Sequence, residues 1–542
     1  MTVKLSYEGL KDRAGWDAAG VALPDYDPAK LAEDTKKDPR WVHFGIGNIF
    51  RIFLGGAADA LIRSGDLDRG ITCAEAFDFE VADKIYAPHD NLTLAVTLHA
   101  DGNRDLRVLG SLSEAVKADG PAGMARLREI FASPGLQMVS FTITEKGYAL
   151  RDAAGRYFPH VLEDMRHGPD AVHGVIGILT ALLLHRYEAG QLPLALVSMD
   201  NVSQNGEKLR QAVLETANNW VDNENAPCSF LRYLTDPEKI TFPWTMIDKI
   251  TPRPSPAVAE SLAEAGIEDM DIVVTDRHTY IAPFVNAEGP QYLVVEDSFP
   301  NGRPPLEKAG IYMTDRETVN KSERMKVTVC LNPIHTALCT YGILLGYELF
   351  ADAVRDPELD RLARLLGYGE GLPVVEDPGI LSPRAFLDEL MAERFPNPWL
   401  GDTCQRIAVD ISQMTAIRFG ENIRAYAERE GTAEGLVAVP LAIAGWLRYL
   451  LAADDQGRPY ELSPDPMLPR LREQLAGVVP GDPDSLKGQL RPILSNTTLF
   501  GSDLYRAGLG EKIEGMVREQ LAGPGAVRET LRRWLAGTDR SA

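Results

Sequence analysis

Short apolar strands alternate with polar turns and helical stretches through the first 320 residues of the chain. Residues 41–44, 71–77, 137–144 and 193–201 each form a strand-like run, and glycine-containing or polar segments follow them. Runs that are apolar on both faces are typical of parallel strands that helices cover on both sides. We therefore expect an α/β fold built from parallel βαβ units in this part of the chain.

The pattern changes beyond about residue 320. Apolar residues then recur at helical spacing, as in 386–395 and 437–452, and few strand-like runs remain. A chain of 542 residues is also too long for a single core. We expect three parts: an N-terminal extension that precedes the fold (1–40), an α/β domain (41–320) and a mainly α-helical domain (321–542).

Charge and cysteine content limit the partners and the compartment. A net charge of −22 disfavours nucleic acid and anionic membranes, and a small anionic ligand would need a locally positive pocket. The five cysteines are scattered without CxxC spacing, which favours a reducing compartment. The apolar runs 175–184 and 436–447 are shorter than the roughly 20 residues of a membrane helix. We expect a cytoplasmic protein that binds neither nucleic acid nor a membrane.

A glycine turn, GIGNIFR, follows the first apolar strand and opens a helix. Gly45 can turn tightly, and Gly47 would let the backbone approach a pyrophosphate at the helix N-terminus. The third glycine of the dinucleotide fingerprint is missing, so a plain turn is an equal alternative. Arg51 would contact phosphate or be solvated. The motif supplies five candidate cofactor-binding residues: Gly45, Gly47, Asn48, Phe50 and Arg51.

An acid at the end of the second strand would hold the adenosine ribose. Asp78 or Glu75 in EAFDFE is placed for this role, although the gap from Gly47 is about 30 residues rather than the usual ~20. An acid here favours NAD, because it would repel the 2′-phosphate of NADP. The alternative is that Asp78 caps the next helix.

Polar segments also follow the later strands. TEKGY (144–148) and DNVSQNG (200–206) come directly after buried strands, where open α/β sheets bind ligands. Thr144 and Glu145 are therefore further candidates for cofactor binding. Each segment alone is more often turn chemistry than a site.

The segment KVTVCLNPIHTAL carries Lys326, Asn332 and His335 among apolar residues. On an uninterrupted helix Lys326 and His335 would lie about 180° apart, at about 100° per residue. They converge only where the helix is broken or bulged, which Pro333 makes plausible. The alternative is a snorkelling lysine, a capping asparagine and a core histidine.

Together these motifs resemble the long-chain mannitol dehydrogenase family of polyol-specific and sugar-acid dehydrogenases. The resemblance runs from about residue 40 to the C-terminus. It rests on GIGNIFR, TITEKGY, SMDNVSQNG, FPWTMIDKITP, QYLVVEDSFPNGRPPLE, ERMKVTVCLNPIHT and DTCQRIAVDISQ, in family order. The segment ERMKVTVCLNPIHTALCTYGILLGY resembles most the fructuronate reductase branch.

The resemblance implies a Rossmann-type N-terminal domain that binds NAD, a helical C-terminal domain and a hydride transfer without a metal. It implies that Lys326 is the general acid/base and that Asn332 and His335 orient the substrate carbonyl. Asn201 would add a second amide to the oxyanion site, and Glu323 would serve in proton passage. Asp248 and Arg406 would line the substrate pocket. One departure is that six residues, not the usual five, separate Lys326 from Asn332.

We expect an NAD-dependent enzyme that reduces D-fructuronate to D-mannonate. Ketone reduction needs a proton as hydride arrives, and a desolvated lysine can donate it near neutral pH. Candidates for the cation that binds the substrate carboxylate are Arg406, Arg253 and Lys249. The alternatives are a family enzyme acting on tagaturonate or on a neutral polyol such as mannitol or arabinitol, and a catalytically silent NAD-binding regulatory protein.

Overall fold

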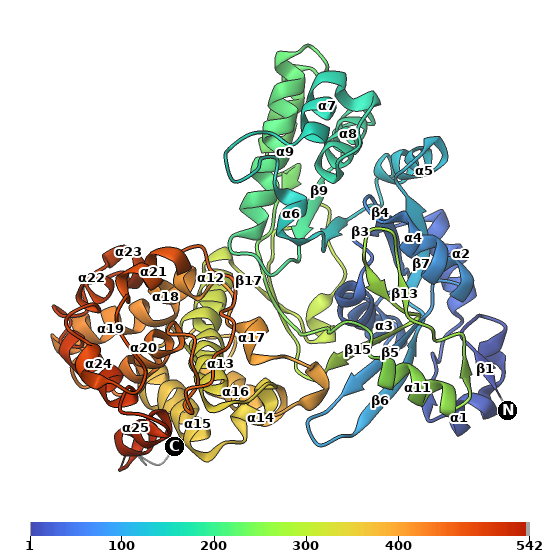
Figure 1. Cartoon of the computed structure of the whole chain (residues 1–542). Helices are drawn as coiled ribbons and strands as arrows, with labels where there is room; N and C mark the ends of the chain where they lie inside the picture. The colour runs from blue at the N-terminus through green and yellow to red at the C-terminus, as the bar shows by residue number, and fades with distance from the viewer. Residues whose placement is uncertain (1, 538–542) are drawn as a thin grey trace. The chain divides into compact units, whose positions relative to one another are not determined.

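The computed structural model describes residues 2–537. The chain divides into two compact units, Met1–Asn320 and Lys321–Ala542, coloured blue to green and yellow to red in Figure 1. Strands gather in the first unit, and helices make up the second. Each unit is described by itself below.

A parallel sheet of six strands forms the centre of the first unit. Its order across the sheet is β10-β9-β8-β3-β4-β7, and every neighbouring pair is parallel. Numbered along the chain, this is the doubly wound order 3-2-1-4-5-6 of a Rossmann-type fold. The strands are β3 (Trp41–Phe44), β4 (Ile71–Glu75), β7 (Leu112–Lys117), β8 (Met138–Phe141), β9 (Leu194–Ser198) and β10 (Ile240–Thr241).

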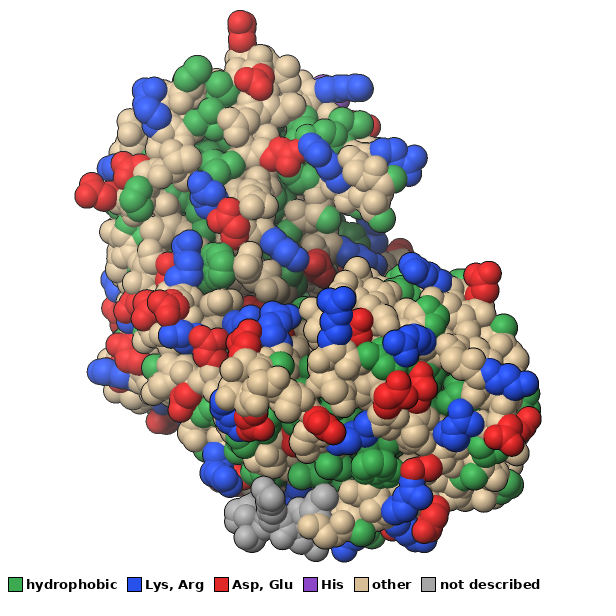
Figure 2. Space-filling view, turned by 90° about the vertical axis from the view of Figure 1, so that its left-hand side faces the viewer, with side chains coloured by type: hydrophobic (Ala, Val, Ile, Leu, Met, Phe, Trp, Pro, Cys, Tyr) green, Lys and Arg blue, Asp and Glu red, His purple; other side chains and the backbone are tan. Residues whose placement is uncertain are grey.

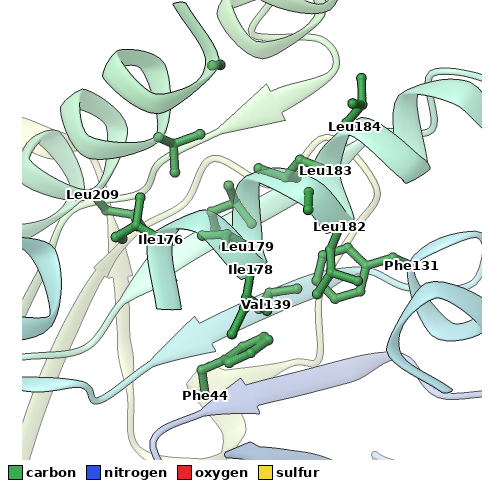
Figure 3. Close-up of a cluster of buried hydrophobic side chains, with 14 of the residues drawn as sticks. Phe44, Phe131, Val139, Ile176, Ile178, Leu179, Leu182, Leu183, Leu184 and Leu209 are labelled. Atoms are coloured by element: carbon green, nitrogen blue, oxygen red, sulfur yellow. The ribbon is translucent and has the colours of Figure 1, made fainter. Parts of the chain in front are cut away.

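Both faces of this sheet are buried, which explains the continuous apolar runs in the sequence. Phe44 and Val139 contribute to one core cluster, whereas Trp41 on β3 and Met138 on β8, which point to the opposite face, join another. Figure 3 shows α8 (Val175–Glu188) lying over Phe44 and Val139. The first cluster also includes residues of α5 (Pro121–Phe131) and α9 (Asn205–Asp222), and the second includes residues of α3 (Gly55–Arg63).

Smaller sheets complete the first unit. One has the order β15-β5-β6-β2 and contains the antiparallel pair β5 (Thr93–Leu98) and β6 (Arg104–Leu109). Another has the order β11-β16-β17. Its strand β11 (Thr245–Asp248) ends at Asp248, which is buried.

The first 40 residues do not precede the fold, contrary to our expectation. Strand β1 (Val3–Lys4) pairs with β12 (Ile267–Glu268), and Trp16 on α1 (Arg13–Ala18) is fully buried. Strand β2 (Val21–Ala22) pairs with β6. Strands β1 and β2 are only two residues long, so they leave almost no periodic pattern in the sequence.

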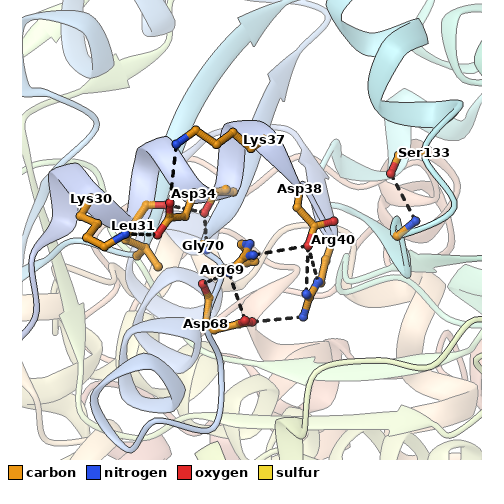
Figure 4. Close-up of polar contacts among 12 residues, drawn as sticks. Lys30, Leu31, Asp34, Lys37, Asp38, Arg40, Asp68, Arg69, Gly70 and Ser133 are labelled. Atoms are coloured by element: carbon orange, nitrogen blue, oxygen red, sulfur yellow. Dashed lines mark hydrogen bonds and ion pairs between the residues drawn. The ribbon is translucent and has the colours of Figure 1, made fainter.

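Ion pairs account for the polar composition that suggested an extension. On α2 (Pro28–Lys37), Asp34 pairs with Lys30 and Lys37, as Figure 4 shows. The carboxylate of Asp38 lies 2.9 Å from Arg40 and 3.5 Å from Arg69. Charged residues therefore cover the outside of a segment that is packed against the rest of the unit.

Helices form the second unit. A continuous helical stretch consists of α12 (Arg316–Met325), which begins just before the unit boundary, η7 (Lys326–Cys330) and α13 (Asn332–Leu345). Helix α13 packs against α20 (Ala438–Tyr449), where the Tyr341 hydroxyl donates to the Leu441 carbonyl at 2.8 Å. The amide of Gln520, on α24 (Gly510–Gln520), donates to the same hydroxyl at 3.0 Å.

Two helical stretches, Pro159–Glu188 and Arg316–Leu344, are long and apolar enough to cross a membrane by length and composition alone. Within the protein, 56% and 83% of their most apolar windows are buried, as in core helices. On the face drawn in Figure 2, acidic and basic side chains are interspersed rather than gathered by sign.

We predict that Gly445→Ala destabilises the second unit by about 1–3 kcal/mol, because a Cβ there would lie 2.5 Å from the Tyr341 ring. The matched control is Gly515→Ala on α24, where no atom lies within 4 Å of the added carbon. That substitution should stabilise the helix by about 0.4–1 kcal/mol. Urea unfolding of both variants tests the pair, and equal shifts would contradict the close approach of α13 and α20.

Candidate active site

The glycine turn after β3 has the geometry expected for close approach of a ligand. Gly45 has a φ of +92°, and a Cβ there would lie 2.1 Å from the Thr142 carbonyl oxygen, so only glycine fits. A Cβ on Gly47 would meet no atom within 4 Å, and this glycine lines an open cavity. The first glycine therefore makes the turn, and the second leaves the backbone accessible.

A cavity of about 1290 Å³ opens where β3, β4 and β8 end. Its walls include the glycine turn, the residues that follow β4 and the segment Thr142, Ile143 and Thr144 after β8. Because β3 lies between β4 and β8, this is the point where the strand order reverses, which is where doubly wound sheets bind ligands.

The two candidate acids after β4 have different roles. One carboxylate oxygen of Glu75 accepts the backbone N–H groups of residues 76–78 at 2.8–3.1 Å, and the other accepts from Ile46 N–H at 3.3 Å. Burial raises the pKa of Glu75, and these N–H groups oppose the shift. Glu75 thus ties the end of β4 to the glycine turn.

Asp78 is the acid whose carboxylate remains available. Its Oδ2 accepts from the Thr275 hydroxyl at 2.6 Å, while its buried Oδ1 has no hydrogen-bond partner within residues 2–537. The alternative that its side chain caps α4 (Phe79–Val81) is wrong, because it makes no capping bond. Asn48 Oδ1, at the start of the helix after the turn, is likewise buried without a partner in the described chain.

Phe50 and Arg51 follow the glycine turn and have fully buried side chains, which corrects their assignment as cofactor contacts. Phe50 is fully buried and stacks on His43 with ring centroids 3.9 Å apart. Arg51 is neither solvated nor exposed to phosphate, since its side chain is fully buried. Its guanidinium donates to the Thr93 hydroxyl and to the carbonyls of residues 282 and 283 at 2.7–3.1 Å.

A partly buried acid that the sequence analysis missed, Asp200, organises the end of β9. Its carboxylate accepts the N–H groups of Ile143 and Thr144 at 2.9 and 3.0 Å and the Tyr148 hydroxyl at 2.5 Å. Thr144 has a φ of +63°, which the bonds to Asp200 hold in place. Burial raises the pKa of Asp200. The signal was present, because the acid directly precedes Asn201 in the same strand-end motif.

The remaining candidates of the first unit lie at its surface or at strand ends. Asn201 is exposed and follows β9, and Asp248 ends β11. Glu145 is outside the cavity lining and pairs with Lys208 at 2.7 Å. The Arg253 guanidinium lies over the Tyr280 ring at 4.1 Å, and Lys249 donates to the Glu288 carbonyl at 2.9 Å.

The expected interruption after Lys326 is confirmed: residues Lys326–Cys330 form a π-helical turn between α12 and α13. The Leu331 N–H donates to the Lys326 carbonyl at 3.0 Å, five residues back instead of four. Lys326 is 2% exposed. Glu323 precedes it by three residues and is half-buried.

Asn332 and His335 share one face at the start of α13. The Asn332 Oδ1 atom is buried without a hydrogen-bond partner in the described part of the chain. The His335 ring packs between Phe350 and Phe395, with centroids 4.7 and 5.1 Å away. Burial is the main cause that lowers the pKa of His335 to about 3. Three guanidinium groups contribute to the same shift: Arg394, Arg418 and Arg406.

The arrangement in the second unit can bind and polarise a carbonyl. His335 is neutral near pH 7 because its pKa is low, so its ring can donate a hydrogen bond but does not supply a proton as an acid. Arg406 lies in α17 (Cys404–Ile407), and its side chain is 64% exposed and pairs with Asp402. Sequence reasoning missed Arg394 and Arg418, which reach this site from separate helical segments.

Comparisons with known proteins agree with this architecture. The family model "Mannitol dehydrogenase Rossmann domain" matches residues 39–308, and "Mannitol dehydrogenase C-terminal domain" matches residues 318–519. The D-mannonate oxidoreductase of Thermotoga maritima is 50% identical over 98% of both chains. The D-mannonate oxidoreductase of Escherichia coli is 29% identical over 89% of this chain and 92% of its own.

Solved structures are also similar over nearly the whole length. The mannitol 2-dehydrogenase of Pseudomonas fluorescens, in a ternary complex with NAD and D-mannitol, covers 99% of this chain and 100% of its own, with a TM-score of 0.68 and 26% identity. A substrate-free D-sorbitol dehydrogenase covers 95% of this chain and 98% of its own, with a TM-score of 0.77 and 26% identity. The chain therefore belongs to the mannitol dehydrogenase family of oxidoreductases, which confirms the family, the fold class and the enzyme class expected from its sequence.

Proposed function

We propose that the protein reduces D-fructuronate to D-mannonate, reversibly, with NAD as its cofactor. The observation that carries this proposal is the 50% identity, over 98% of both chains, to a relative named D-mannonate oxidoreductase. The site chemistry is consistent with it, because a buried lysine, a neutral imidazole and an asparagine side chain whose amide group can donate lie on one helical stretch.

The residues of the first unit fit NAD. Gly47 leaves space beside the helix N-terminus, where a pyrophosphate would bind to backbone N–H groups. The unpartnered Oδ1 of Asp78 would accept a ribose hydroxyl, and its charge would repel the 2′-phosphate of NADP. Asn48, Thr144 and the rest of the glycine turn complete the binding residues. When bound, NADH would supply the hydride for the reduction, and NAD+ would accept it in the reverse direction.

The residues of the second unit would handle the carbonyl and its proton. His335 and the amide of Asn332 would donate hydrogen bonds to the substrate oxygen. Lys326 would transfer its proton to that oxygen as the hydride adds to the carbon, so that an alcohol forms instead of an alkoxide. In the reverse direction neutral Lys326 would remove the hydroxyl proton. Glu323 would relay protons to the lysine, and Arg406 would line the substrate site. The family resemblance also assigns substrate contacts to Asn201 and Asp248 of the first unit.

A neutral polyol is the second candidate substrate, because the similar mannitol 2-dehydrogenase was solved with D-mannitol. A test that separates the candidates is NADH oxidation, followed by absorbance, with D-fructuronate, D-tagaturonate and D-fructose. We expect the highest kcat/KM with D-fructuronate. A higher kcat/KM with D-fructose would make a neutral polyol and its ketose the substrate pair instead of a sugar acid. NADH binding without any turnover would favour a silent regulatory protein.

We predict that Lys326→Met lowers kcat by a factor on the order of 10²–10⁴, because methionine keeps the apolar volume but carries no proton. The dissociation constant of NADH should stay unchanged in a fluorescence titration. Lys487→Met, at an exposed lysine of the same unit, is the control. Full turnover by the Lys326 variant would assign the proton transfer to another group.

We predict that Asp78→Ser weakens NADH binding roughly 10- to 150-fold, because a hydrogen bond to a charged acceptor is lost. Removal of the carboxylate should at the same time strengthen binding of NADPH. Titrations of both nucleotides measure the two effects without turnover. The control is Asp83→Ser, which removes an exposed acid paired with Lys117 at 3.0 Å. An unchanged preference between the two nucleotides would remove Asp78 from the ribose site.

A further inference from the structure

Arg418 lies beside the face of α13 that carries Asn332 and His335. It belongs to the π-helical segment η12 (Ala416–Gly420), and its Nη1 donates to the Thr336 hydroxyl at 2.7 Å. That hydroxyl in turn donates to the Asn332 carbonyl at 3.0 Å. Thr336 lies one turn beyond Asn332 on the same face of α13. The charge of Arg418 also contributes to the low pKa of His335, so the guanidinium is near both proposed carbonyl-binding residues.

The hydrogen bonds of Arg418 differ from those of the structural arginines of this chain. Arg51, Arg186 and Arg448 are buried, and their guanidinium groups make three, five and three hydrogen bonds to protein oxygens. Arg418 makes one such bond, and no carboxylate pairs with it within the described residues. A guanidinium has several N–H donors, so most of those on Arg418 are left for another acceptor.

The surroundings of Arg418 favour an anion. Burial lowers its pKa, because the charged form is poorly solvated where it lies. Arg394 and Arg406 add positive charge near the same histidine. In a protein of net charge −22, a partly buried guanidinium that pairs with no carboxylate among the described residues would attract a small anion.

The cations suggested by the sequence are less suited to this task. Arg406 is largely exposed and already paired with Asp402. Arg253 lies over the Tyr280 ring, and Lys249 donates to a backbone carbonyl, both in the first unit. Arg418 combines partial burial, unused donors and proximity to His335.

We infer that Arg418 binds the carboxylate of the sugar-acid substrate through a two-pronged charge-assisted hydrogen bond. The planar guanidinium matches a carboxylate in geometry and charge, and bonding to an anion would compensate its burial. The inference rests on the proposed function, because only a sugar-acid substrate carries this group. Arg418 would thus set the preference for acids over neutral polyols.

The test compares Arg418→Gln with Arg418→Lys and with the control Arg424→Gln, which removes an exposed arginine paired with Glu421 at 3.3 Å. We expect Arg418→Gln to lower kcat/KM for D-fructuronate roughly 10- to 150-fold, mainly through KM. Turnover of D-fructose and the affinity for NADH should change little. Lysine should restore part of the loss as a point charge, and the control should behave like the wild type.

A binding experiment gives the same comparison without turnover. D-mannonate and D-mannitol are titrated into the enzyme–NADH complex, in which neither can be oxidised. Arg418→Gln should lose affinity for the acid and keep affinity for the polyol. If this variant does not fold, Arg418→Lys and rescue of Arg418→Ala by guanidinium ions provide the comparison.

The outcomes separate the two proposals. Equal losses for acid and polyol would overturn the inference and make Arg418 a support for Thr336. No loss for either would overturn it as well. The wild-type preference between D-fructuronate and D-fructose decides the proposed function independently, since it involves no change at Arg418.

Discussion

The π-helical turn at Lys326–Cys330 is the constraint on which the candidate site of the second unit depends. Pro333 has no N–H, so it cannot bond to the carbonyl of Val329 four residues earlier, and the α-helical pattern must change there. The bond from Leu331 N–H to the Lys326 carbonyl spans five residues. A turn of this kind accommodates one more residue than an α-helical turn. The six-residue spacing between Lys326 and Asn332 is therefore compatible with a continuous helix whose C-terminal part stays packed against α20.

In the first unit, hydrogen-bond satisfaction separates structural polar groups from those available to a ligand. Glu75, which is buried, and Asp200, which is partly buried, accept hydrogen bonds from backbone N–H groups, and they fix the two loops that border the glycine turn. Asp78 and Asn48 each have a buried oxygen without a partner among the described residues. Because an unsatisfied buried polar atom costs about 1–3 kcal/mol, a ligand that bonds to it recovers this energy. The same reasoning distinguishes Arg418 from Arg51.

The sequence predicted the features that local patterns encode. Continuous apolar runs indicated the parallel sheet, the glycine pair indicated the turn, and Pro333 indicated the bulge after Lys326. Features that depend on contacts distant in the sequence were missed or misassigned. Residues 1–40 join the fold through two-residue strands, and Arg51 is satisfied by carbonyls more than 200 residues away. Domain roles, site assignments and the cytoplasmic location stay predictions.

The arginines around His335 connect substrate choice to the chemistry of the site. Their positive charges disfavour the imidazolium, so His335 remains neutral near pH 7, and in the proposed mechanism the proton transfer would fall to Lys326. A bound carboxylate would offset part of this positive charge and raise the pKa of His335. Burial is the larger cause of the low pKa and would persist in the complex, because the ring stays between Phe350 and Phe395. The histidine would therefore stay neutral with an acid substrate as well, and the site could bind an anion without acquiring a second acidic group beside the carbonyl.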